Sequence, residues 1–156
     1  MVDREGKYLT FALAKEEYGI GILKVKDIIR MIPITGVPRT PAFIKGVINL
    51  RGKVIPVVDL RLKFGMEEAP YTERTCIIVV EMKVQRGSAL IGMVVDSVSE
   101  VLNIKVADIE EAPSFGTKLD TDYILGMAKI NGGVKILLDI NRVLTADEII
   151  RFHKAG

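Results

Sequence analysis

Short apolar stretches, separated by polar or glycine-containing turns, run along most of this chain and predict β-strands. The expected strands are Tyr8–Ala14, Glu17–Gly21, Val47–Leu50, Val54–Val58, Cys76–Met82, Ala89–Val95, Met127–Ile130 and Val134–Leu138. Each successive pair is separated only by a short turn, so the strands are expected to form antiparallel hairpins. The last turn contains Asn131-Gly132, a strong hairpin signal because both residues tolerate positive φ.

A repeat relates the two halves of the sequence. Gly46–Leu60 matches Gly126–Ile140, 80 residues later, in a plan of glycine, apolar strand, glycine turn, apolar strand and aspartate. Upstream of these segments, Gly19–Ile29 similarly matches Gly92–Leu102, 73 residues later. The order is the same in both halves. The chain is therefore expected to contain two copies of one small β unit, and the two copies are expected to superimpose.

Helices are expected to be short, and each begins at a residue that can cap its first turn. The caps are Thr40, Asp59, Asp139 and Thr145, and the helices that they begin are expected over 40–46, 60–64, 140–144 and 146–154. The last helix carries Ile149, Ile150 and Phe152, so it is expected to dock on the body of the protein.

These elements predict one mainly β domain over 1–156, built as two small antiparallel barrels. Lobe 1 is expected at about 8–65 and lobe 2 at about 74–144, with 66–74 between them. Val54–Val58 is apolar at nearly every position, which implies that both of its faces are covered. One face would line a barrel, and the other would pack on the sister lobe or on another protein.

Composition narrows the classes of function. Hydrophobic residues make up 49% of the chain, which fits either a well-filled double core or a surface that meets a partner. With 22 basic and 20 acidic residues, the charge is nearly balanced, and nothing indicates a nucleic-acid-binding arm. The single cysteine, Cys76, excludes an internal disulfide. No signal peptide and no membrane-spanning run is evident, so a cytoplasmic location is expected.

The sequence offers little catalytic chemistry. The only histidine, His153, lies near the end of the chain and makes a poor catalytic partner for Cys76 in its strand. Asp59 and Asp139 are better explained as helix caps than as a carboxylate pair. The sequence shows no metal-ligand spacing and no phosphate-binding loop. No catalytic, cofactor-binding or metal-binding residue is therefore expected.

Three segments resemble the chemotaxis coupling proteins of the CheW type: Glu17–Asp27, Thr40–Gly65 and Gly92–Val101. The resemblance implies two five-stranded SH3-like barrels around a hydrophobic core, with short capping helices and a C-terminal helix. It also implies a non-catalytic adaptor that joins the cytoplasmic tips of chemoreceptors to the regulatory domain of a chemotaxis histidine kinase. That regulatory domain carries the same strand motif. A free-standing adaptor is nevertheless expected, because the sequence has no phosphoryl-accepting helix or ATP-binding segment.

The resemblance also implies sites. Ile22, Val25 and Asp27 are expected to face the kinase, although the family commonly has a longer acid at the position of Asp27. The receptor helix is expected to lie in an apolar groove between the lobes, lined by Ile34, Val54, Val98 and Phe152. Arg51 is expected to contact a partner that the sequence does not assign. Core packing is the alternative interpretation of the apolar residues.

Two other classes of function remain open at this stage. A small barrel that binds oligonucleotides is the main alternative, although balanced charge and sparse aromatic residues argue against it. The third class, an unrecognised enzyme, would need a cleft with titrating groups, and the sequence offers few.

Overall fold

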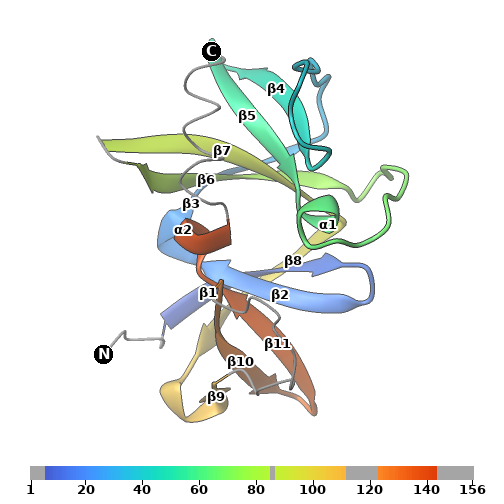
Figure 1. The fold of residues 1–156 in the computed structure, drawn as a ribbon. Coiled ribbons are helices and arrows are strands. Elements are labelled where there is room, and N and C mark those ends of the chain that lie inside the picture. Colours follow the sequence, from blue (N-terminus) through green and yellow to red (C-terminus); the bar gives the residue numbers. More distant parts are fainter. Residues whose placement is uncertain (1–5, 85–86, 112–122, 144–156) are drawn as a thin grey trace.

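The computed structural model describes residues 6–84, 87–111 and 123–143, which form two β-sheets with short helices (Figure 1). The strands are β1 (Gly6–Leu13), β2 (Glu16–Gly21), β3 (Val25–Arg30), β4 (Ile44–Leu50), β5 (Lys53–Asp59), β6 (Cys76–Val84), β7 (Gly87–Val95), β8 (Ser97–Ile104), β9 (Ile109–Glu110), β10 (Ile124–Ile130) and β11 (Gly133–Leu138). The helices are α1 (Leu60–Lys63), α2 (Ile140–Val143) and two 3₁₀ turns, η1 (Ile22–Lys24) and η2 (Val106–Asp108). The mainly β class is confirmed, and the expected terminal helix over 146–154 lies outside the described residues.

The two sheets do not follow the two halves of the sequence. The central sheet has the order β3-β6-β7-β5-β4 and comes from one continuous stretch, 25–95. The terminal sheet, β8-β1-β2-β11-β10-β9, combines strands from both ends of the described chain. The sheets therefore differ from the lobes expected at 8–65 and 74–144. Residues 66–74 connect α1 to β6 on the central-sheet side and do not link the two sheets.

The predicted repeat is present in the strand pairing. The hairpins β4–β5 and β10–β11 have the same bulge at their start, and Arg51 and Asn131 have the same φ of 51° in their turns. β5 pairs in parallel with β7 at Val57 and Gly92, and β11 pairs in parallel with β2 at Leu137 and Gly19. Each unit therefore gives its first two strands to one sheet and its later strands to the other.

The helix that the sequence predicted over residues 40–46 is absent, and this segment forms a turn and the start of β4. Residues 40–46 do not form a helix, because the chain makes a turn closed by the Ile44 N–H and the Pro41 carbonyl at 3.0 Å and then enters β4. Gly46 has a φ of 140° at the bulge opposite Val57. Pairing with β5 thus overrides the local Thr-Pro and glycine signals, which suit a turn as well as a helix.

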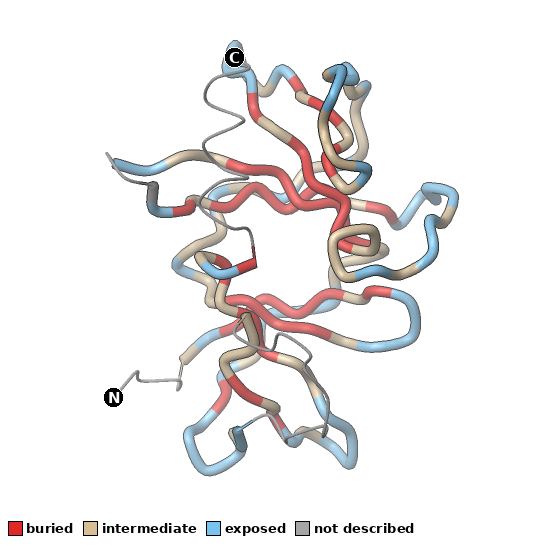
Figure 2. Tube along the Cα trace, viewed as in Figure 1, coloured by how far each residue is buried: buried red, intermediate tan, exposed pale blue. Residues whose placement is uncertain are grey.

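Apolar side chains fill three clusters, which Figure 2 shows as buried segments along the strands. One lies between the two sheets, one within the central sheet and one within the terminal sheet. On β5, Val57 belongs to the cluster within the central sheet and Val58 to the cluster between the sheets. The expected cover on both faces is therefore confirmed at this end of the strand, whereas Val54 at the other end is exposed.

Asp96, between β7 and β8, ties the two sheets together. Arg61 on α1 donates from Nε to Asp96 Oδ1 at 2.7 Å, and its Nη2 also donates to Oδ2. Asp96 Oδ2 accepts from the Ala14 amide in the β1–β2 turn at 2.7 Å, and the Asp96 amide donates to the Ala12 carbonyl at 3.0 Å. The hydrogen bonds to Asp96 raise the pKa of Arg61, which keeps the guanidinium charged.

Replacing Asp96 with alanine is expected to lower the free energy of unfolding by about 1–2 kcal/mol, because Arg61 and the Ala14 amide each lose their acceptor. Chemical denaturation would measure this loss. Glu67→Ala is a suitable control, since Glu67 is exposed in the segment after α1. Equal stability of the two variants would show that the tether does not hold the sheets.

Candidate protein-interaction site

The β4–β5 turn and β3 present a charged pair. Arg51 Nη1 lies 3.1 Å from Asp27 Oδ2, and Asp27 Oδ1 accepts a hydrogen bond from the Ile28 amide at 2.9 Å. The Arg51 side chain is 79% exposed, whereas that of Asp27 is only 24% exposed. The amide thus fixes the carboxylate, and the arginine reaches it from solvent. Sequence reasoning named both residues but did not join them.

The turn itself does not require an arginine. Arg51 has a φ of 51°, a left-handed conformation that glycine and asparagine adopt more readily than other residues. The equivalent hairpin has Asn131 with the same φ. Asn49 stabilises the first turn by accepting from the Gly52 amide at 2.9 Å. The guanidinium therefore makes a contact outside the turn, with Asp27.

Val54 follows this turn and is 69% exposed. It lies on the same face of β5 as Val58, which the other sheet covers, so the apolar face of the strand extends beyond that cover. Val134, the repeat equivalent on β11, is also exposed. We call Asp27, Arg51 and Val54 the tip residues; they combine a charged pair with an uncovered apolar side chain.

Ile22, Val25 and Val98 lie where the chain crosses between the sheets. Ile22 is in η1 and Val25 begins β3 at one crossing, and Val98 lies near the start of β8 at the other. All three are half-buried and pack against the cluster between the sheets. Val25 and Val98 are equivalent positions of the repeat. We call Ile22, Val25 and Val98 the crossover residues; their side chains are partly accessible, as the residues of a contact surface must be.

The remaining receptor candidates lie elsewhere. Ile34 is half-buried but packs against the cluster within the central sheet, not the one that Val98 contacts. Phe152 lies outside the described residues. Among the described residues, the side chains predicted to line the receptor groove do not share one cluster. The groove between the lobes therefore remains a prediction from the sequence.

Comparison with known proteins gives the family. The CheW-like domain matches residues 7–148. The chain belongs to the CheW family. The chemotaxis protein CheW of Klebsiella aerogenes is 41% identical over 143 residues, covering 92% of this chain and 84% of that protein. CheW of Bacillus subtilis is 34% identical over 139 residues, covering 88% of this chain and 86% of that protein.

A solved CheW structure has the same fold. The scaffolding protein TtCheW from Thermoanaerobacter tengcongensis superimposes with a TM-score of 0.81 at 36% identity, covering 92% of this chain and 95% of that one. CheW proteins are chemotaxis scaffolds, so the expectation of a non-catalytic adaptor is confirmed. The expected mainly β, SH3-like fold is also confirmed, but the described strands form open sheets of five and six strands and not two closed five-stranded barrels. The oligonucleotide-binding alternative is not favoured.

Three further observations concern metal binding, membrane-spanning helices and the single cysteine. The described ranges 6–84, 87–111 and 123–143 contain no group of three His, Cys, Asp or Glu side chains that could hold a metal ion. In the same part of the chain, no helix is long and apolar enough to span a bilayer. Cys76 is half-buried at the start of β6, and its thiol donates to the Arg74 carbonyl at 3.2 Å.

Proposed function

We propose that this CheW-family protein couples chemoreceptor tips to the regulatory domain of a chemotaxis histidine kinase, in the cytoplasm at receptor clusters. The Asp27–Arg51 pair is the observation that carries the proposal. It places an arginine in a conformation that the turn does not favour, beside a carboxylate that the backbone fixes. Arginine is enriched at protein interfaces, where its planar group makes directed hydrogen bonds.

The two groups of residues suit different partners. The tip residues offer charge and one exposed valine, which fits the polar surface of a folded kinase domain. The crossover residues offer half-buried apolar side chains over the cluster between the sheets, which fits the apolar face of a receptor helix. Ile22 and Val25, expected from the sequence to face the kinase, are assigned to the receptor here because they pack with Val98 against that cluster. Val54, expected from the sequence to line the receptor groove, is assigned to the kinase here because it is exposed after the Arg51 turn and lies outside that cluster.

Two substitutions test the assignment through separate binding measurements with a kinase regulatory domain and a receptor hairpin fragment. Arg51→Ala is expected to weaken kinase binding about 10-fold and to leave receptor binding unchanged. Val98→Ala is expected to weaken receptor binding by a similar factor, since it removes apolar contact area. Isothermal titration calorimetry measures both affinities.

Each substitution has a neighbour as its control. Lys53→Ala removes an exposed positive charge just after Arg51, and Val101→Ala removes an exposed valine from the same strand as Val98. Both controls should bind like the unmodified protein. If Arg51→Ala keeps full affinity for both partners, the tip residues are not a docking site. A Val98→Ala variant that affects only kinase binding would reverse the assignment.

A further inference from the structure

The ion pair between Asp27 and Arg51 joins the two outer strands of the central sheet. β3 and β4 lie at opposite ends of the strand order β3-β6-β7-β5-β4. Arg51 is nevertheless in the turn after β4, and its Nη1 lies 3.1 Å from Oδ2 of Asp27 on β3. The sheet therefore curls so that its edges meet at this point, where a side-chain ion pair joins them.

Asp27 is fixed by its own strand and keeps one oxygen without a hydrogen bond. Its Oδ1 accepts from the Ile28 amide at 2.9 Å. Its Oδ2 is buried and, among the described residues, accepts no hydrogen bond, so the contact with Arg51 is ionic and not a directed hydrogen bond. A buried carboxylate oxygen without a donor is costly unless a positive charge lies beside it. Asp27 therefore acts on the guanidinium by its charge, and the Ile28 amide keeps it from turning toward a partner.

Arg51 faces outward from this junction. Its side chain is 79% exposed, against 24% for that of Asp27. A guanidinium carries five N–H donors in a planar fork, and the described part of the chain gives Arg51 no partner other than Asp27. Lys53, two residues later, is also exposed. The surface of the turn is therefore positive, and it fits an acidic surface of a partner.

We propose that Arg51 bridges two carboxylates in the complex with the kinase: that of Asp27 and that of an aspartate or glutamate on the kinase regulatory domain. This rests on the proposed function, which assigns the tip residues to that domain. Asp27 is then a positioning residue, which holds the guanidinium at the junction and does not touch the kinase. The same partner surface covers the exposed side chain of Val54, which excludes water and strengthens the bridge.

A double-mutant cycle tests whether Asp27 acts through Arg51, with the kinase affinity of the full chain measured by isothermal titration calorimetry. Asp27→Asn removes the charge but keeps an oxygen that can accept from the Ile28 amide. It is expected to weaken kinase binding about 3- to 5-fold when Arg51 is present and to have no effect in the Arg51→Ala background. Asp27→Glu keeps the charge and is expected to bind within about 2-fold of the unmodified protein.

Further variants test for a carboxylate on the partner. Arg51→Lys keeps the charge but loses the planar fork, so it is expected to bind nearly as weakly as Arg51→Ala. Raising the salt concentration from about 50 to 500 mM should weaken binding of the unmodified protein more than that of Arg51→Ala, which has one ion pair fewer to be screened. Acid-to-amide substitutions on the kinase domain, made one at a time, should include one in whose presence Arg51→Ala has no further effect.

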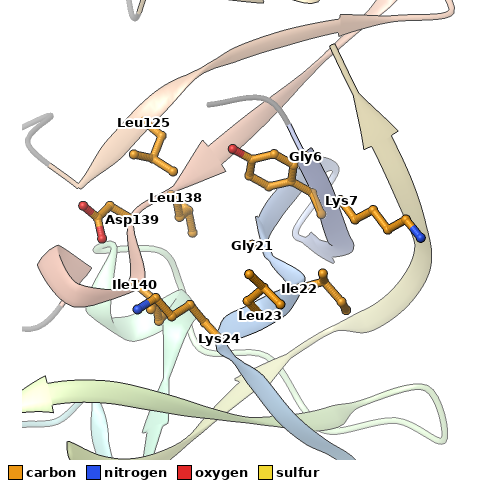
Figure 3. A pocket seen from close by; sticks show the side chains of 11 residues that line it. Gly6, Lys7, Gly21, Ile22, Leu23, Lys24, Leu125, Leu138, Asp139 and Ile140 are labelled. Carbon is orange, nitrogen blue, oxygen red and sulfur yellow. The ribbon is translucent and has the colours of Figure 1, made fainter. Parts of the chain in front are cut away.

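Two charged side chains away from the pair serve as controls. Glu81→Gln breaks the ion pair with Lys26, which spans 3.7 Å between β6 and β3 with both side chains 45% exposed. Lys7→Ala removes an exposed lysine of β1, on the terminal sheet, which lines a cavity between β1, η1 and α2 (Figure 3). The tip residues do not line that cavity. Both controls should bind the kinase domain and a receptor hairpin fragment like the unmodified protein.

The alternatives give different results. If Asp27→Asn weakens kinase binding equally with and without Arg51, Asp27 touches the kinase itself; if it has no effect in either background, or weakens receptor and kinase binding alike, it does not position the arginine. Full affinity of Arg51→Lys, or no kinase acid coupled to Arg51, would exclude the bridge, although weak binding by Arg51→Ala would still support the proposed function. Full affinity of Arg51→Ala would defeat the bridge and the proposed docking site together.

Discussion

Replacing Gly46 with alanine is expected to lower the free energy of unfolding by about 4 kcal/mol or more. A Cβ atom at this position would lie 1.9 Å from the Thr35 carbonyl oxygen, and the φ of 140° strains any residue with a side chain. The Thr35 backbone cannot move away freely, because its N–H and carbonyl are both bonded to Val47 at 2.9 Å.

Urea denaturation of the purified variant measures the effect, with Gly36→Ala as the control. Gly36 follows Thr35 in the segment before β4, but a Cβ atom built there meets nothing within 4 Å. The control should lose less than about 1 kcal/mol. Matching stabilities of the Gly46 and Gly36 variants would mean that the segment before β4 can shift away and that the close approach is not required.

Val58→Glu is expected to prevent cooperative folding, whereas Val54→Glu on the same strand face should leave it intact. Val58 is 1% exposed between the two sheets, so a glutamate there would bury an unpaired charge at a cost of about 4 kcal/mol or more. Val54 is 69% exposed, and its replacement should change stability by about 0.5 kcal/mol.

Thermal unfolding followed by circular dichroism compares the two variants directly. Both variants place a glutamate on the same face of β5, and they differ only in whether the other sheet covers that position. A folded Val58→Glu protein with an unchanged melting temperature would show that the sheets are not packed together in solution. Unfolding of Val54→Glu would show that the exposed end of the strand is covered there.

The sequence predicted the local elements better than their pairing. The hairpins, the glycine turns and the caps Asp59 and Asp139 follow from neighbouring residues, and the structure contains them. The parallel contact of Val57 with Gly92 joins residues from different units, and no local signal states which hairpin meets which. The repeat marks Gly19 and Gly92 as equivalent, but it does not state that Gly19 pairs with Leu137 and Gly92 with Val57.

The candidate site shows the same limit. The sequence indicates Arg51 because Asn131 occupies the equivalent turn, and it indicates Asp27 through the family resemblance. Their ion pair depends on how β3 lies relative to the β4–β5 turn, which is a tertiary property. The sequence also leaves open which apolar strand residues are exposed, because an apolar residue fits a strand pattern whether or not another sheet covers it. Only the packed sheets show that Val54 is uncovered and that Val25 and Val98 contact one cluster.

The sharing of strands between units limits how this chain can be divided. A cut within residues 66–74 would leave two fragments, each with part of both sheets, and each could hide its apolar strands only by joining the other. Cleavage there would give a two-chain protein, not two independent domains.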